Sequence, residues 1–139
     1  MIYFLDSNVI LYAVGKEHLY REPCAEILRK SENEEIELII STEIIQEILY
    51  FYSVRNLRSK GLAVAEKVIQ ITREILSVDR IDIEKAMELM QDNPPLKPRD
   101  AIHAAVMLNH DSLYILSADA DFDQLPQIQR IDPLKFEEF

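Results

Sequence analysis

Four acidic residues stand where elements of secondary structure are expected to begin or end, and together they could bind a metal ion. They are Asp6, Glu47, Asp100 and Asp119. Clustered carboxylates cannot all stay charged without a counter-ion, because each raises the pKa of the others. Oxygen ligands without paired His or Cys favour a hard cation, so we predict a site for Mg²⁺ or Mn²⁺.

A divalent ion of this kind would support hydrolysis of a phosphodiester bond. It generates a hydroxide from bound water and screens the charge of a phosphate, and a pair of ions clamps the attacking and leaving oxygens. The sequence offers no Ser/His/Asp order, Cys nucleophile or glycine-rich phosphate loop for a competing chemistry. We predict Asp6, Asp100, Asp119 and Asp121 as metal ligands.

The run Asp119-Ala-Asp121-Phe-Asp123 begins like a calcium-binding loop, but it lacks the residues that such a loop needs. Its sixth and twelfth positions should be Gly and Glu, and here they are Gln124 and Arg130. We interpret Ser117 with Asp119 and Asp121 as a turn into a helix that adds oxygens to the shared site. Simple helix capping is the alternative, most of all for Asp123.

The N-terminal residues explain why the acids could meet. Met1 to Leu5 is an apolar run typical of a strand buried on both faces, so Asp6 would follow its carboxyl end, with Ser7 and Asn8 able to cap the next helix. In a parallel sheet the carboxyl ends of strands and the starts of the following helices share one edge. The alternative is that Asp6 only caps that helix.

Strands and helices are expected to alternate along the whole chain. Further strands are predicted at 36–40, 113–116 and 127–131, with a short one possible at Val78, and helices at 9–14, 20–31, 42–57, 61–77, 82–90 and 98–109, before a short helix near 117–122. This order predicts one α/β domain over residues 1–139, a three-layer α/β/α sandwich around a parallel sheet of four to five strands.

Two of the acids need a choice between interpretations. On the helix at 42–57, Glu47 borders the apolar stripe and Glu43 points to solvent, so Glu47 is the candidate. Asp100 could simply favour the helix N-terminus, but its helix is otherwise apolar, which predicts a partly desolvated carboxylate. We interpret His103, one turn later, as a packed residue rather than a ligand.

Composition limits the other possibilities. The net charge of −10 repels nucleic acid unless bound cations change the local sign at the acidic cluster. No apolar run reaches the length of about 20 residues that crosses a bilayer, and the N-terminal run lacks the basic flank of a signal peptide. With a single cysteine, Cys24, the sequence indicates a cytoplasmic protein without an internal disulfide.

The order and spacing of these motifs resemble the PIN domain family, in particular the small VapC-type toxins. The resemblance covers essentially the whole chain and rests on the motifs FLDSN at 4–8, IST at 40–42 with Gln46-Glu47, RDAIHAA at 99–105 and LSADADF at 116–122. It implies that Asp6, Glu47, Asp100 and Asp119 form the acidic quartet, with Asp121 and Ser117 in support. Asn8 departs from the small hydroxyl residue that is commoner there.

What the resemblance implies is an Mg²⁺- or Mn²⁺-dependent endoribonuclease that leaves a 5′-phosphate on RNA. It also implies a homodimer and a protein antitoxin as partner. We predict that phosphates of the RNA are held by basic residues flanking the acidic pocket. The candidates are Arg55, Arg58, Lys97 and Arg99. Tyr50 and Tyr52 could stack on bases, but core or dimer packing is the stronger interpretation for both.

Two other classes of protein remain open at this point. A phospho-acceptor signalling domain has a similar sheet, but it needs a pair of acids at one strand end and a lysine at the end of the last strand. Asp6 has no adjacent acid, and no such lysine lies near Ile131. A binding module that keeps this fold without catalysis is the second alternative, and the complete acidic quartet speaks against it.

Overall fold

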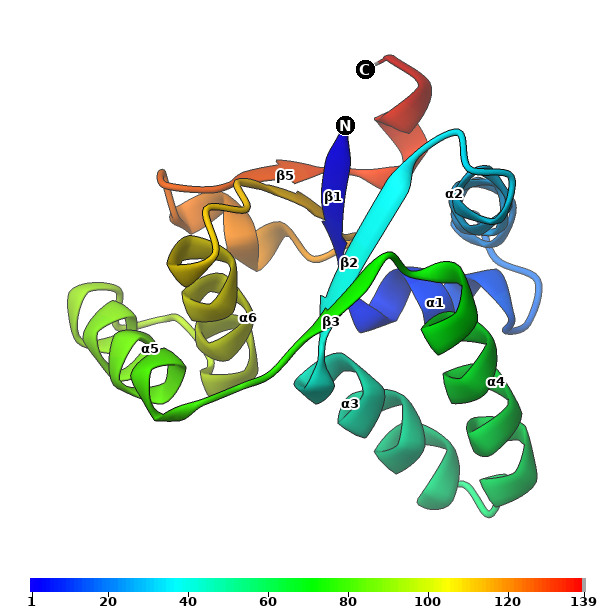
Figure 1. Cartoon of the computed structure of the whole chain (residues 1–139), viewed down its shortest axis with the longest axis horizontal. Helices are drawn as coiled ribbons and strands as arrows, with labels where there is room; N and C mark the ends of the chain where they lie inside the picture. Colours follow the sequence, from blue (N-terminus) through cyan, green and yellow to red (C-terminus); the bar gives the residue numbers. More distant parts are fainter. Residues whose placement is uncertain (139) are drawn as a thin grey trace.

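Five parallel strands form a single sheet with the N-terminal strand at its centre (Figure 1). The computed structural model describes residues 1–138. The strands are β1 (Ile2–Leu5), β2 (Glu37–Ser41), β3 (Glu74–Leu76), β4 (Tyr114–Leu116) and β5 (Gln129–Ile131). Their spatial order is β3-β2-β1-β4-β5. The chain adds β2 and β3 on one side of β1 and then returns to add β4 and β5 on the other side, so the switch point lies between β1 and β4. Ligands of such sheets bind beyond the carboxyl ends of the strands at the switch point.

Helices cover both faces of the sheet and confirm the predicted three-layer sandwich (Figure 1). One face carries α1 (Ser7–Ala13), α2 (Arg21–Glu32), α3 (Thr42–Ser53) and α4 (Arg58–Ile71), and the other carries α5 (Arg80–Asp92) and α6 (Pro98–Asn109). Short 3₁₀ segments, η1 (Ala120–Gln124) and η2 (Pro133–Glu138), flank β5. Among the residues described, no helix is both long and apolar enough to span a bilayer.

The central strands and α6 form the core because their residues are apolar on every side. Phe4 and Leu5 in β1 and Ile40 in β2 are fully buried, as expected for strands covered on both faces. In α6, Pro98 occupies the first turn and the run from Ala104 to Met107 has no exposed surface. These elements form a rigid base for the polar residues at their ends.

The prediction of one helix over residues 61–77 is wrong. The helix begins at Arg58 and ends at Ile71, and the chain then becomes β3, so the predicted strand at Val78 is displaced as well. The Thr72 hydroxyl bonds to the Val68 carbonyl at 2.9 Å, and the Arg73 N–H bonds to the β2 carbonyl of Leu38 at 2.8 Å. Pairing with the sheet therefore overrides a helical apolar period that happens to continue through Ile75.

Candidate metal site at the carboxyl edge of the sheet

Asp6 is buried at the end of the central strand and has two roles. As the N-cap of α1 it accepts a hydrogen bond from the Ser7 N–H at 2.8 Å through Oδ1. Its Oδ2 accepts one from the Ser117 hydroxyl at 2.6 Å and one from the Asn8 amide at 3.2 Å. The capping alternative is therefore correct for Oδ1. Oδ2 takes no part in the cap and accepts hydrogen bonds from Asn8 and from the distant Ser117.

Ser117 and Asn8 tie the first strand to the turn after β4. The Ser117 Oγ, besides donating to Asp6, accepts a hydrogen bond from the Asp119 N–H at 3.0 Å. The Asn8 side chain donates to Ser117 Oγ at 3.2 Å and accepts from the Ala118 N–H at 3.2 Å. The three residues predicted to support the site, Ser7, Asn8 and Ser117, all contact Asp6.

Asp100, Asp119 and Asp121 form a carboxylate group whose oxygens come within 4.8 Å of one another. Asp100 enters from the first turn of α6, whereas the other two come from the turn after β4, where Asp119 Oδ1 accepts from the Asp121 N–H at 2.9 Å. Asp123 points elsewhere and pairs with Arg130 at 2.9 Å. The spacing of the three oxygens is compatible with a shared divalent cation.

Glu47 and His103 form a second group with Asp6, again with atoms within 4.8 Å of one another. Glu47 is 8% exposed, as predicted from its place beside the apolar stripe of α3, whereas Glu43 is partly exposed. The His103 Nε2 lies 2.8 Å from Glu47 Oε1, and both side chains are buried. The contact of His103 with Glu47 goes beyond the prediction of a packed or rim histidine. The sequence signal for this contact is its spacing of one turn from Asp100 in an apolar helix.

One depression of about 550 Å³ joins the two groups. Its lining comprises Asp6, Ser7, Asn8, Glu47, Lys97, Pro98, Arg99, Asp100 and Asp119. We call it the acidic pocket. All four acids of the predicted quartet therefore open into the same space, which is the geometry that the shared sheet edge predicts.

Burial and crowding of like charges raise the pKa values of the central carboxyls. Burial, together with the charges of Asp119 and Asp6, raises the pKa of Asp100 to about 6. The pKa of Asp6 is also raised, chiefly by burial. Burial lowers the pKa of His103, but the hydrogen bond that its Nε2–H donates to Glu47 and the charge of Asp6 outweigh it, so the net shift is upward. These sites favour a bound positive charge, and their oxygen donors suit Mg²⁺ or Mn²⁺.

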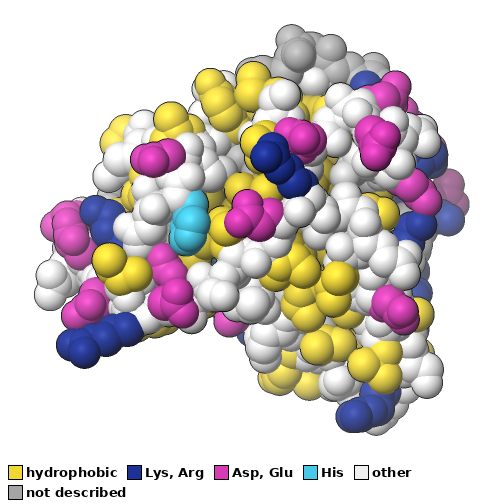
Figure 2. All heavy atoms as spheres, in the orientation of Figure 1, with side chains coloured by type: hydrophobic (Ala, Val, Ile, Leu, Met, Phe, Trp, Pro, Cys, Tyr) yellow, Lys and Arg dark blue, Asp and Glu magenta, His cyan; other side chains and the backbone are white. Residues whose placement is uncertain are grey.

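Two of the four predicted basic residues lie at the acidic pocket. Lys97 Nζ is 3.7 Å from Asp121 Oδ2, and Arg99 Nη1 is 3.8 Å from Glu47 Oε2. Arg55 instead stacks on Phe51, with its guanidinium 3.6 Å from the ring centroid, and lines a neighbouring groove that shares Asn8 with the pocket. On the face drawn in Figure 2, basic side chains are dispersed among acidic ones.

Of the remaining basic and aromatic candidates, Arg58 and Tyr50 lie on the surface and Tyr52 lies in the core. Arg58 is exposed at the start of α4 and lines neither the acidic pocket nor the groove beside it. Tyr52 is buried, in agreement with core packing, and Tyr50 is exposed with the Arg99 guanidinium 6.0 Å from its ring.

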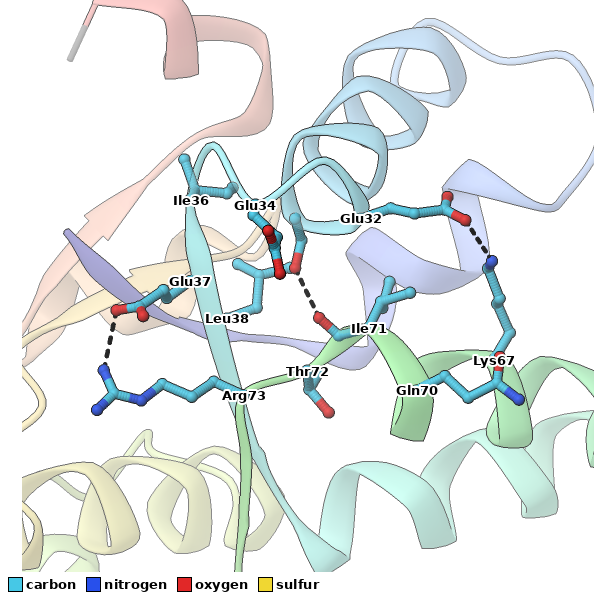
Figure 3. Close-up of a pocket in the computed structure, with 11 residues that line it drawn as sticks. Glu32, Glu34, Ile36, Glu37, Leu38, Lys67, Gln70, Ile71, Thr72 and Arg73 are labelled. Atoms are coloured by element: carbon cyan, nitrogen blue, oxygen red, sulfur yellow. Dashed lines mark hydrogen bonds and ion pairs between the residues drawn. The ribbon is translucent and has the colours of Figure 1, made fainter.

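Another depression, of about 510 Å³, lies between β2, α2 and α4 (Figure 3). Its two basic side chains are already paired, Lys67 with Glu32 at 2.6 Å and Arg73 with Glu37 at 2.9 Å. Neither of the two acid groups that could hold an ion lies there among the described residues. The chemistry is therefore concentrated at the acidic pocket.

The parallel α/β sandwich and the carboxylates clustered at the carboxyl ends of its strands define a class of proteins with a site suited to a cation. The family model of the PIN domain matches residues 3–128, and this chain belongs to the PIN domain family. The chain is 31% identical to VapC ribonuclease Mb1869c of Mycobacterium bovis over 127 residues, which cover 91% of this chain and 97% of that protein. It is 36% identical to ribonuclease VapC23 of Mycobacterium tuberculosis over 102 residues, covering 73% and 80% respectively.

Solved structures share the fold at lower sequence identity. VapBC2 from Rickettsia felis, solved with a DNA fragment from its promoter, superposes with a TM-score of 0.72 at 18% identity, covering 94% of this chain and 98% of that one. VapC20 of Mycobacterium tuberculosis, described as a sarcin-ricin loop cleaving toxin, gives 0.72 at 16% identity, with 91% and 95% covered. These likenesses confirm the predicted PIN-like architecture.

Proposed function

We propose that the chain is a divalent-metal-dependent endoribonuclease of the VapC type, the toxin of a toxin–antitoxin pair, with residues 1–139 acting as one nuclease domain. The single observation that supports it best is the meeting of Asp6, Glu47, Asp100 and Asp119 in one pocket. The relatives that match over most of the chain are named ribonucleases.

In this proposal the carboxylates hold the ion and the substrate between them. Asp6, Asp100, Asp119 and Asp121 would ligate Mg²⁺ or Mn²⁺, which when bound activates water and neutralises phosphate charge. Ser7, Asn8 and Ser117 fix the orientation of Asp6 through their hydrogen bonds. Glu47, in a buried position beside Asp6, is the group available to accept a proton from the attacking water.

RNA would bind through basic residues at and beside the acidic pocket. Lys97 and Arg99 closely precede Asp100 and line the pocket with it, so they can contact the phosphates next to the scissile bond. Arg55 lines the adjoining groove and can contact a phosphate further along the strand, and Arg58 would act at longer range from the surface. Cleavage at the pocket would leave a 5′-phosphate.

The cellular context proposed for the chain is that of a cytoplasmic toxin held by a protein antitoxin, with the toxin itself a homodimer. The structural neighbours include toxin–antitoxin complexes from Rickettsia felis and Klebsiella pneumoniae. Identification of a small DNA-binding protein in the neighbouring reading frame, and its co-purification with this chain, would support the pairing.

Cleavage of single-stranded RNA with Mg²⁺ or Mn²⁺ tests the proposal. Wild type should cut internally and stop on chelation, Asp6→Asn should be inactive, and Asp92→Asn, at an exposed acid at the end of α5, should match wild type. RNA binding without cleavage by wild type would favour the non-catalytic binding module. Covalent labelling by a phospho-donor in place of RNA cleavage would favour the signalling domain.

A further inference from the structure

His103 and Glu47 join the two helical layers beside the acidic pocket, which Glu47 lines. Glu47 belongs to α3 on one face of the sheet and His103 to α6 on the other (Figure 1), yet their side chains meet at 2.8 Å. The His103 side chain is 1% exposed and that of Glu47 is 8% exposed. Because both side chains are shielded from water, this hydrogen bond to a charged acceptor is strong and directional.

The surroundings of the imidazole define which nitrogen holds the proton. A carboxylate only accepts, so His103 Nε2 must donate to Glu47 Oε1. The other ring nitrogen, Nδ1, is buried and has no hydrogen-bond partner among the described residues. Of the two neutral tautomers the geometry therefore favours the one protonated on Nε2, and an imidazolium would keep the same Nε2–H donor to Glu47.

The two carboxylate oxygens of Glu47 have different partners. Oε1 is committed to His103, whereas Oε2 points toward Arg99, whose Nη1 is 3.8 Å away at the rim of the pocket. Without His103 the carboxylate could rotate about its terminal torsion, which is broad for glutamate. The pair therefore holds one Glu47 oxygen toward the space that Asp6 and Asp100 also line.

Packing alone does not account for an imidazole at this position. The nearest aromatic contact of His103 is with Phe4, whose ring centroid lies 6.0 Å away at a tilted angle. The neighbouring α6 residues Ala104 and Ala105 are fully buried, and an apolar side chain at position 103 would fill the same core without a polar group to satisfy. What the imidazole adds over an apolar side chain is a donor aimed at Glu47.

We propose that His103 is a positioning residue: its Nε2–H fixes Glu47 so that Oε2 faces the reacting water and phosphate. The inference rests on the proposed nuclease function, because it assigns Glu47 a part in that reaction. His103 itself touches neither substrate nor ion in this scheme. It sets the orientation of the carboxylate that does.

Three substitutions separate a donor from a space-filling role. His103→Gln keeps an amide N–H that can reach Glu47, and His103→Leu keeps the volume without the donor. His110→Gln is the matched control, since the His110 ring lies outside the acidic pocket and hydrogen-bonds to the backbone carbonyl of Val106. We expect His103→Leu to lower kcat about 10- to 100-fold with KM little changed, and His103→Gln to recover most of that loss.

A double-mutant cycle with Glu47→Gln tests whether His103 acts through Glu47. If it does, adding His103→Leu to Glu47→Gln should cost less than about threefold more, because the two residues act as a unit. Losses that multiply in the double variant, or a His103→Leu enzyme with unchanged kcat, would overturn the proposal. Thermal unfolding of each folded variant shows whether a loss of rate reflects unfolding instead.

A measurement that needs no RNA cleavage distinguishes failure of this inference from failure of the proposed function. In ¹⁵N-imidazole NMR spectra of the full chain, His103 should show a protonated Nε2, with the Nε2 resonance shifting in Glu47→Gln and not in Asp92→Asn. An Nε2 that carries no proton, or no response to Glu47→Gln, would refute the pair whatever the enzyme cleaves. The expected spectra from a protein that cuts no RNA would retain the pair and reject the nuclease.

Discussion

The Ser117 hydroxyl donates a hydrogen bond of 2.6 Å to Oδ2 of Asp6, although the two residues are 111 positions apart in the sequence. The contact exists because β1 and β4 are neighbours in the sheet, with Leu5 paired to Leu116. The next residue of each strand is therefore placed at the same edge. The geometry of the acidic pocket depends on this register, since a slip of β4 by one residue would turn Ser117 away from Asp6.

Ser117→Ala should destabilise the protein and weaken its affinity for the metal. The change removes the donor to Asp6 and the acceptor of the Asp119 N–H in a fully buried place, so we expect a loss of about 1–3 kcal/mol in the free energy of unfolding. Metal affinity should fall about 10-fold or more. Denaturant unfolding and calorimetric Mn²⁺ titration measure both, with Ser53→Ala, at an exposed α3 position, as control.

The stability of the metal-free protein should contain a component that falls as the pH rises from about 4 to about 6. The folded state raises the pKa of Asp100 from 3.8 to about 6, so in this window the folded chain holds a proton that the unfolded chain has released. At about 1.4 kcal/mol per pKa unit, the full loss is up to about 3 kcal/mol. The difference between the pH profiles of wild type and Asp100→Asn isolates it; parallel profiles would contradict the assignment.

Asp100→Asn should stabilise the metal-free protein at neutral pH and abolish its stabilisation by metal. The substitution removes a buried charge repelled by Asp119 and Asp6, but also a proposed ligand. With excess Mn²⁺ and then a chelator, the melting temperature of wild type should rise and return, because a ligand that binds only the folded state stabilises it. That of the variant should stay constant. A metal-dependent rise in the variant would exclude Asp100 as a ligand.

Gly61→Ala should destabilise the packing of α4 against α3. Gly61 is buried against Tyr52, and an added Cβ would lie 2.8 Å from the Tyr52 Cβ, which is anchored to the backbone of α3 and cannot rotate away. We expect a loss of about 1–3 kcal/mol from overpacking despite the better helix propensity of alanine. Ser59→Ala, at an exposed position on the same helix, is the control, and unfolding in urea is the measurement.

Charge removal at Lys97 and Arg99 should affect RNA binding more than the same change at Arg58. The first two line the acidic pocket, whereas Arg58 is exposed outside it. In the inactive Asp6→Asn background, Lys97→Ala with Arg99→Ala should weaken binding and reduce the slope of log affinity against log salt by up to about two, one for each phosphate contact. Arg58→Ala should change the slope less, and equal effects would argue for a diffuse electrostatic contribution.

The acids of the pocket were predictable because chain order and sheet geometry restrict where strand ends can lie. Asp6 follows β1, Asp119 follows β4 and Asp100 opens α6, and all three positions face the same edge in a parallel arrangement. Glu47 followed from helical periodicity alone. A single strong local pattern was enough at each of these positions.

Other features depend on contacts that no local pattern contains. β3 was missed because its Ile75 continues the apolar period of α4, and only pairing with β2 distinguishes strand from helix. The role of His103 depends on a side chain 56 positions earlier. Arg55 stacks on Phe51 and lines a neighbouring groove in place of the acidic pocket, which follows from a cation–π contact within one helix turn.

The central position of β1 has a consequence for synthesis on the ribosome. Ser117 is translated 111 positions after Asp6, and the two residues meet only when the chain has returned across the sheet to pair β4 with β1. A nascent polypeptide that has not reached this point has no complete pocket. Any reaction at the acidic pocket would therefore begin only after residues 114–119 have been translated and β4 has paired with β1.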